Sequence, residues 1–318
     1  MPFSPMTPGP TTPTPEQQAR YDVLFDEVFP LYEERRYDEA LARLAARGAG
    51  LEHWSSDLAH ITACLQSLAG RPDEALATLQ SALDDDGDWW DERILREDDD
   101  LAPLQQLEGW DDLVREAHAR ANAYNASAPA EPPVLLRPDG PARGVVVTLH
   151  GSGQRAARTA DTWSAATAEG FAVLAVASSQ RSTPTHTSWP DQARAARDVA
   201  HALESLDADL RDLPLLAGGF SAGGRAALLW ALSADPVPVA RLLVVAPSIR
   251  AEEQPGEPLE HIEGLVLVGA DDDLSDGVLV IADRLEAAGL RLETVAGMAH
   301  HYPDDFAARL TTELDTMA

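Results

Sequence analysis

The sequence predicts two parts of different fold class: an all-helical region, followed by an α/β region with a mostly parallel sheet flanked by helices. In the first half, two segments repeat at an offset of 35 residues, with apolar positions at helical spacing. In the second half, short apolar runs alternate with helical stretches. Nearly continuous apolar strands between helices are typical of a parallel sheet covered on both faces.

The composition excludes several function classes. The chain of 318 residues has 24 Lys and Arg against 53 Asp and Glu, a formal charge of −29 that opposes binding to nucleic acid or to an anionic membrane. Salt adaptation is an alternative explanation of this acidity. No signal peptide and no apolar run long enough to span a membrane is found, and the single cysteine excludes an intrachain disulfide. We expect a cytoplasmic protein without a membrane span.

Residues 1–15 are rich in Pro and Thr and predict a disordered tail. Residues 16–125 carry the repeat, in which Asp38–Leu44 aligns with Asp73–Leu79 after a short break in each copy. This pattern resembles the tetratricopeptide helix–turn–helix repeat, with small residues at Ala40 and Ala75 and a divergent third copy over 101–121. The resemblance implies a groove for a protein partner or for self-association; simple packing against the rest of the chain is the favoured alternative.

No metal or cofactor is expected. The acidic runs 84–86 and 98–100 lack the spacing of a calcium loop, so we interpret them as solvated loops. Cys64 is interpreted as a small buried apolar residue. The histidines other than the pair 300–301 form no recognised ligand spacing.

Residues 126–133 combine small residues with prolines and predict a linker, followed by an α/β domain over 134–318. The predicted strands are Val145–Leu149, Phe171–Val176, Leu213–Leu216, Leu242–Val245, Leu265–Val268 and Leu290–Val295. The predicted helices are Gln192–Leu206, Gly224–Ala234, Gly277–Ala288 and Asp304–Leu314. In such sheets the chemistry gathers at the carboxyl ends of the strands.

One motif at that edge points to a nucleophile. Gly219-Phe-Ser221-Ala-Gly223 follows a predicted strand and opens a predicted helix, which is the context of a G-x-S-x-G nucleophile elbow. Small residues at both ends of the motif let strand and helix approach closely enough to project the Ser221 hydroxyl.

A serine hydroxyl needs a base, and the base needs an orienting carboxylate. Both residue types follow later strands: Asp271-Asp272-Asp273 after the fifth predicted strand and His300-His301 after the sixth. The order serine, aspartate, histidine is that of the α/β-hydrolases.

Residues 134–318 thus resemble an α/β-hydrolase of the carboxylesterase, acyl-protein thioesterase and dienelactone hydrolase group. The G-x-x-D pattern of that group falls on Asp272 and its G-x-x-H pattern on His300. His301 stands where the group often has glycine, and Asp271 and Asp273 remain alternatives for the acid. The resemblance further implies an oxyanion hole formed by the backbone N–H groups of Ser152, in the H-G-x-G segment, and of Ala222.

The predicted function is a serine hydrolase that cleaves a carboxylic ester or thioester through an acyl-enzyme, with Ser221, Asp272 and His300 as the triad. His150 is interpreted as a loop-shaping residue and not as a second base. Gln154, Ser179 and Trp189 are candidates for the substrate pocket, with ordinary packing as the alternative for Trp189. The rival hypotheses are a non-catalytic interaction protein on a hydrolase scaffold, and a peptidase or acyltransferase on the same fold.

Overall fold

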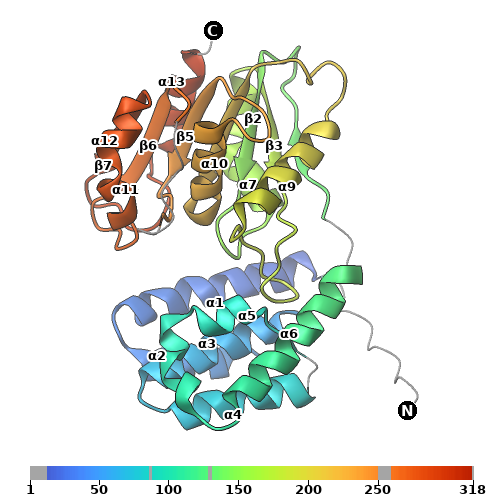
Figure 1. Cartoon of the computed structure of the whole chain (residues 1–318), viewed down its shortest axis with the longest axis vertical. Helices are drawn as coiled ribbons and strands as arrows, with labels where there is room; N and C mark the ends of the chain where they lie inside the picture. The colour runs from blue at the N-terminus through green and yellow to red at the C-terminus, as the bar shows by residue number, and fades with distance from the viewer. Residues whose placement is uncertain (1–12, 86–87, 128–130, 250–258, 317–318) are drawn as a thin grey trace. The chain divides into compact units, whose positions relative to one another are not determined.

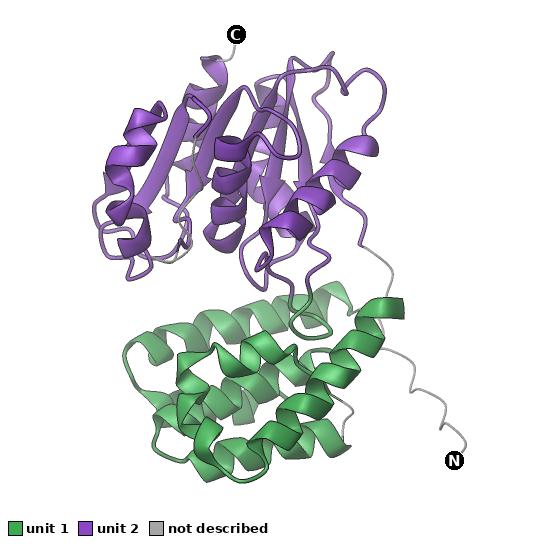
Figure 2. Cartoon of the chain, in the orientation of Figure 1, with its two compact units in different colours: residues 1–128, 181–186 green, residues 129–180, 187–318 purple. Residues whose placement is uncertain are grey.

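The computed structural model describes residues 13–85, 88–127, 131–249 and 259–316. The predicted tail, up to residue 12, and the middle of the predicted linker lie outside these ranges. The chain divides into two compact units (Figure 2): residues 1–128 with 181–186, and residues 129–180 with 187–318. We describe each unit by itself.

All the secondary-structure elements of the first unit that lie between residues 13 and 127 are helices. Its elements are α1 (Pro15–Glu33), α2 (Tyr37–Arg47), η1 (Glu52–Trp54), α3 (Ser55–Leu68), α4 (Pro72–Asp85), α5 (Glu92–Arg96), η2 (Asp99–Gln106) and α6 (Trp110–Ser127). Successive α-helices from α1 to α4 pack as neighbours, and η2 packs against α3 and α4. Ala40 of α2 and Ala75 of α4, the small residues of the predicted repeat, have no exposed surface.

Local sequence signals account for the ends of these helices. The Thr14 side chain accepts a hydrogen bond from the Gln17 N–H group, and the Gln17 side chain accepts one from the Thr14 N–H group, which forms a capping box at the start of α1. α6 continues to Ser127 and so takes up the first residues of the predicted linker. The assignment of these helix pairs to the tetratricopeptide family stays a prediction.

The second unit is a seven-stranded sheet with helices on both faces (Figure 1). The strands stand in the order β1-β3-β2-β4-β5-β6-β7, and only β1, at one edge, is antiparallel to its neighbour. Their bounds are β1 (Val134–Leu136), β2 (Gly144–Leu149), β3 (Phe171–Val176), β4 (Leu215–Phe220), β5 (Arg241–Val245), β6 (Gly264–Gly269) and β7 (Leu290–Val295). This architecture confirms the predicted fold class.

Two apolar cores lie on opposite faces of this sheet. One core joins the sheet to α9 (Gln192–Glu204), α10 (Ser221–Ser233) and α12 (Ala282–Ala287). The other joins it to α7 (Ala156–Trp163), α8 (Ala165–Ala168) and α13 (Phe306–Asp315). Every residue of β2, β3, β5 and β6 is buried, which explains why these strands are continuous apolar runs in the sequence.

The structure differs from the predicted elements in three places. The edge strand β1 and the helices α7 and α8 were not among the predicted elements. β4 begins later than predicted and extends to Phe220, directly before Ser221. The predicted helix Gly277–Ala288 is interrupted at Ile281, whose backbone leaves helical geometry between α11 (Asp276–Val280) and α12.

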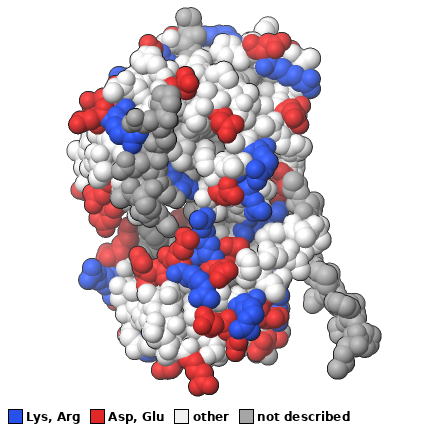
Figure 3. Space-filling model, viewed as in Figure 1, with Lys and Arg blue, Asp and Glu red and all other residues white. Residues whose placement is uncertain are grey.

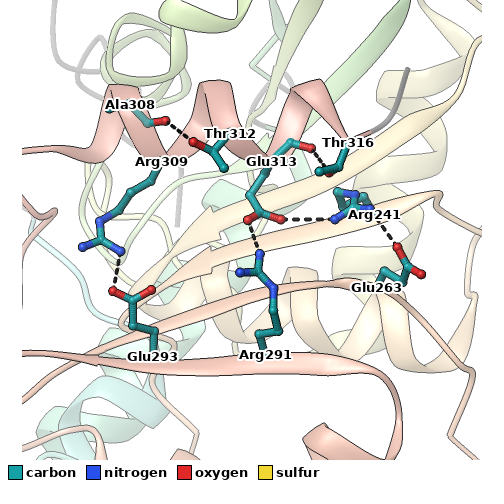
Figure 4. Close-up of polar contacts among 9 residues, drawn as sticks. All are labelled: Arg241, Glu263, Arg291, Glu293, Ala308, Arg309, Thr312, Glu313 and Thr316. Atoms are coloured by element: carbon teal, nitrogen blue, oxygen red, sulfur yellow. Dashed lines mark hydrogen bonds and ion pairs between the residues drawn. The ribbon is translucent and has the colours of Figure 1, made fainter.

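A network of charged side chains joins α13 to the sheet at the amino ends of the strands (Figure 4). The Glu313 carboxylate is 2% exposed and accepts hydrogen bonds from Arg241, at the start of β5, and from Arg291 of β7. Arg241 also pairs with Glu263, which is 69% exposed, at 2.8 Å. Moving α13 away from the sheet would separate Glu313 from its arginine partners and leave a buried charge uncompensated. The ion pairs of Glu313 therefore help to hold α13 in place.

On the face shown in Figure 3, acidic side chains are scattered among uncharged residues, and arginines lie beside many of them. Many arginines form ion pairs one helical turn away, such as Arg93 with Glu97 and Arg96 with Glu92. None of the described helices has the length and the apolar composition needed to cross a bilayer.

Candidate active site

Ser221 occupies a strained turn between β4 and α10. Its φ is +54°, a left-handed conformation that a residue with a side chain adopts at a cost of about 1–3 kcal/mol. The turn depends on two glycines. A Cβ on Gly219 would lie 2.6 Å from the Gly223 backbone, and a Cβ on Gly223 would lie 2.3 Å from the carbonyl oxygens of Leu149 and His150. The absence of side chains at both ends of the motif therefore lets the start of α10 approach the end of β2.

His300 lies between the candidate nucleophile and a carboxylate. Its Nε2 is 2.8 Å from Ser221 Oγ, and its Nδ1 is 2.9 Å from Asp272 Oδ2. The three residues come from α10 and from the loops after β6 and β7. Because an ionised carboxylate only accepts hydrogen bonds, this arrangement fits a ring with the proton on Nδ1 and with Nε2 as the acceptor for the Ser221 hydroxyl.

Of the three neighbouring aspartates, Asp272 is the one that reaches the imidazole. Its side chain is 1% exposed, whereas Asp271 and Asp273 are exposed to solvent. Its second oxygen, Oδ1, accepts a hydrogen bond from the Leu274 N–H group at 2.9 Å, which fixes the plane of the carboxylate. The sequence motif alone did not separate these three residues; their burial does.

Packed against His300 are aromatic side chains that were not predicted from the sequence. The Phe220 ring lies 5.1 Å from the His300 ring and stacks on Tyr302 at 4.8 Å. The Tyr302 hydroxyl accepts a hydrogen bond from Trp163 Nε1 at 3.2 Å. By contrast, the His301 ring is exposed and contacts the neighbouring Tyr302 carbonyl. The feature of the sequence that could have indicated this aromatic group is Tyr302, which lies two residues after His300.

The loop after β2 is held by His150, which is 1% exposed. The His150 Nδ1 lies 2.8 Å from the Gly151 carbonyl oxygen and its Nε2 accepts from the Ser178 N–H group at 3.3 Å, a pattern that fits a neutral ring. On either side of the exposed Ser152, the Gly151 N–H group binds Gln154 Oε1 and the Gly153 N–H group binds the Thr187 carbonyl. His150 and Gln154 thus shape the turn that carries Ser152.

Trp189 has no exposed surface, and its Nε1 donates to the His150 carbonyl at 2.8 Å. This burial favours the packing alternative for Trp189, and its role as a wall of the substrate pocket stays a prediction. Ser179 is exposed, and its hydroxyl donates to Asp198 of α9 at 3.1 Å; its role in a pocket stays a prediction.

The tip of the loop between Ser179 and Trp189 belongs to the helical unit. There Thr183 and Thr185 donate hydrogen bonds to the Asp57 carboxylate of α3, the second at 2.7 Å. Tyr21 of α1 donates to the same carboxylate at 3.3 Å. Asp57, which is 8% exposed, is thereby satisfied by three hydroxyl groups.

Two family models match this chain. Residues 20–125 match the A/B hydrolase-like N-terminal domain, and residues 140–270 match the serine aminopeptidase S33 family. No curated protein matches the sequence.

Several solved structures resemble the chain. An uncharacterized protein from Bacillus cereus is 21% identical, with 93% of this chain and 99% of that one covered and a TM-score of 0.48. Zea mays acyl-protein thioesterase 2 is 18% identical over 59% of this chain and 99% of its own, with a TM-score of 0.46. A dienelactone hydrolase from Anabaena variabilis is 20% identical over 56% of this chain and 86% of its own, with a TM-score of 0.42.

Proposed function

We propose that this chain, an enzyme of the serine hydrolase type with an α/β-hydrolase fold, cleaves a carboxylic ester or thioester through an acyl-enzyme on Ser221. The observation that carries the proposal is the pair of distances at His300, 2.8 Å to Ser221 Oγ and 2.9 Å to Asp272 Oδ2. Both lie within the range for proton transfer and for orientation of a general base.

The first half of the reaction forms the acyl-enzyme. His300 Nε2 takes the Ser221 proton as Oγ attacks the carbonyl carbon, and Asp272 stabilises the resulting imidazolium. When the tetrahedral intermediate collapses, the bond to the leaving alcohol or thiol breaks, and His300 returns the proton to that group.

The second half hydrolyses the acyl-enzyme. Water donates a proton to His300 Nε2 and attacks the carbonyl carbon of the acyl-enzyme. When the second tetrahedral intermediate collapses, the bond from that carbon to Ser221 Oγ breaks, His300 Nε2 returns the proton to Oγ, and the carboxylic acid is released.

The oxyanion of both intermediates accepts hydrogen bonds from the Ser152 and Ala222 N–H groups. Support for Ala222 comes from its place as the second residue of α10, because the N–H groups in the first turn of a helix have no intrahelical acceptor. Support for Ser152 comes from the turn between Gly151 and Gly153, which is held by hydrogen bonds on both sides.

A fluorophosphonate probe tests the nucleophile. We expect one covalent adduct, mapped by mass spectrometry to Ser221, and no adduct in Ser221→Ala. Ser233→Ala is the matched control, since Ser233 lies in the same helix and its hydroxyl bonds to the Leu229 carbonyl. An adduct on folded Ser221→Ala protein would overturn the assignment.

A peptidase is the second candidate, favoured by the match of residues 140–270 to the serine aminopeptidase family. Hydrolysis rates on p-nitrophenyl esters, acyl-CoA thioesters and amino-acid p-nitroanilides distinguish the candidates. We expect the esters or thioesters to be cleaved with the higher kcat/KM, and a preference for the anilides would favour the peptidase.

A further inference from the structure

Three side chains with metal-binding atoms converge in the helical unit, in a region that the proposed reaction does not use. They are His60 and Cys64 of α3 and Asp98, which precedes η2. One ligand atom from each lies within 4.8 Å of the other two. Cys64 is 4% exposed, and the side chains of His60 and Asp98 are 14% and 25% exposed.

The local structure positions each of these atoms. His60 and Cys64 are four residues apart on one helix, so they share a face of α3. Asp98 is the N-cap of η2: its Oδ1 accepts the Asp100 N–H group at 3.0 Å. The other oxygen, Oδ2, lies 3.3 Å from His60 Nε2 and 3.6 Å from Cys64 Sγ.

These separations fit the coordination shell of a small tetrahedral ion. Bond lengths of about 2.0–2.1 Å to nitrogen and oxygen and about 2.3 Å to sulfur, at tetrahedral angles, place the ligand atoms roughly 3.3–3.6 Å apart. The observed separations are 3.3 Å from His60 Nε2 to Asp98 Oδ2 and 3.6 Å from Cys64 Sγ to the same oxygen, and Sγ lies 3.9 Å from each ring nitrogen of His60. If the Cys64 sulfur and the His60 ring moved a few tenths of an ångström closer together, all three side chains could bind one ion.

We propose that His60, Cys64 and Asp98 bind one Zn²⁺ ion, with water as the fourth ligand. A thiolate, an imidazole and a carboxylate together form a donor set that suits zinc. As the ion binds, the S–H bond of Cys64 breaks, a Zn–S bond forms, and the proton leaves to solvent. The Asp100 N–H group orients the carboxylate ligand through Oδ1.

A bound ion would cross-link two segments of the helical unit. The ion joins Cys64 of α3 to Asp98, 34 residues later in the chain. A link between distant segments stabilises a fold because it restricts the unfolded chain, and an ion bound to the native state adds its binding free energy. The site requires no participation of Ser221, so its test is independent of the proposed hydrolase activity.

The decisive measurement is a Co²⁺ titration of the tag-free, chelator-treated whole protein, followed by absorbance. Because Cys64 is the chain's one cysteine, a thiolate-to-cobalt charge-transfer band can arise only from this residue. We expect this band, intense visible bands of a tetrahedral complex, and displacement of both by one equivalent of Zn²⁺. Absence of the charge-transfer band in the folded wild-type protein would overturn the proposal.

Variants then test the other two ligands by competition for Zn²⁺ with a chromophoric chelator. His60→Ala and Asp98→Asn should each weaken binding at least about 10-fold. The matched controls are His118→Ala, on α6, and Asp99→Asn, an exposed carboxylate next to Asp98; both should bind as the wild type does. Equal affinities in the ligand variants and the controls would contradict the assignment, and a variant that fails to fold leaves the wild-type cobalt spectrum as the deciding result.

Discussion

Replacing Gly223 by alanine should disable the enzyme without altering any functional group. A Cβ at this position would lie 2.3 Å from the carbonyl oxygens of Leu149 and His150, whereas ordinary contacts begin at 3.4 Å. The shortfall is about 1 Å, and both oxygens belong to the backbone, so no side chain can rotate away. The start of α10, which carries Ser221, must move away from the end of β2.

The expected loss follows from that displacement. Ser221 Oγ now lies 2.8 Å from His300 Nε2, and a movement of about 1 Å breaks this hydrogen bond. A misplacement of that size costs about 100-fold in rate, or about 2.7 kcal/mol of transition-state stabilisation. Alanine otherwise favours a helix by about 1 kcal/mol over glycine, so helix propensity cannot account for a loss.

The assay is kcat/KM for p-nitrophenyl acetate, with urea unfolding and circular dichroism to establish that the variant is folded. Gly224→Ala is the matched control, because the nearest atom to its Cβ would be the Val245 carbonyl oxygen at 3.2 Å, which requires a shift of only a few tenths of an ångström. We expect the control to lose less than about 5-fold. The reasoning is refuted if Gly223→Ala keeps activity close to that of the wild type, or if both variants lose the same amount.

Three further predictions concern Asp272, the charged network and the cysteine. Asp272→Asn should lower kcat for ester hydrolysis by about 1000-fold or more, because the His300 imidazole loses its charged acceptor. Asp271 is exposed, so Asp271→Asn should change kcat little. Equal effects of the two substitutions would contradict this prediction. Glu313→Gln should lower the urea-derived free energy of unfolding by about 2–4 kcal/mol, because Arg241, whose side chain is 10% exposed, would then rely on the exposed Glu263 for its charged partner in this network. Glu263→Gln should lower it by less than about 1 kcal/mol, and matching losses would argue against a buried network. Alkylation of Cys64 by iodoacetamide at pH 8, followed by mass spectrometry, should be much slower in the native metal-free protein than in urea. Burial and Asp98 raise the pKa of the thiol, so the native protein contains little thiolate. Similar rates in the two conditions would show that the thiol is accessible.

The sequence predicted most of the sheet, and four of its strands, β2, β3, β5 and β6, are buried along their whole length and form apolar runs. Phe171–Val176 and Leu290–Val295 were predicted with their observed bounds. β4 was predicted too early in the chain, since glycines at its end hide a strand from propensity arguments. β1 has three residues and pairs at the edge, so it carries too little pattern to detect.

The order of Ser221, Asp272 and His300 along the chain predicted their meeting, because parallel strands bring their carboxyl ends to one edge. Sequence spacing could not separate neighbours in the same loop, and burial distinguished Asp272 from Asp271. The burial of Trp189 was left open for a similar reason, because the sequence does not say whether an indole at the end of a loop faces solvent or the core. The catalytic roles themselves stay predictions until the probe and variant experiments are done.

Residues 181–186 give the helical unit a piece of chain that is far from the rest of it in sequence. The polypeptide consequently crosses between the two units three times: after residue 128, after residue 180 and after residue 186. A fragment that begins at the linker would keep Thr183 and Thr185 but lose Asp57, their hydrogen-bond acceptor. The two units are therefore not interchangeable modules. Truncation or recombination at the linker would separate residues 181–186 from the rest of the helical unit.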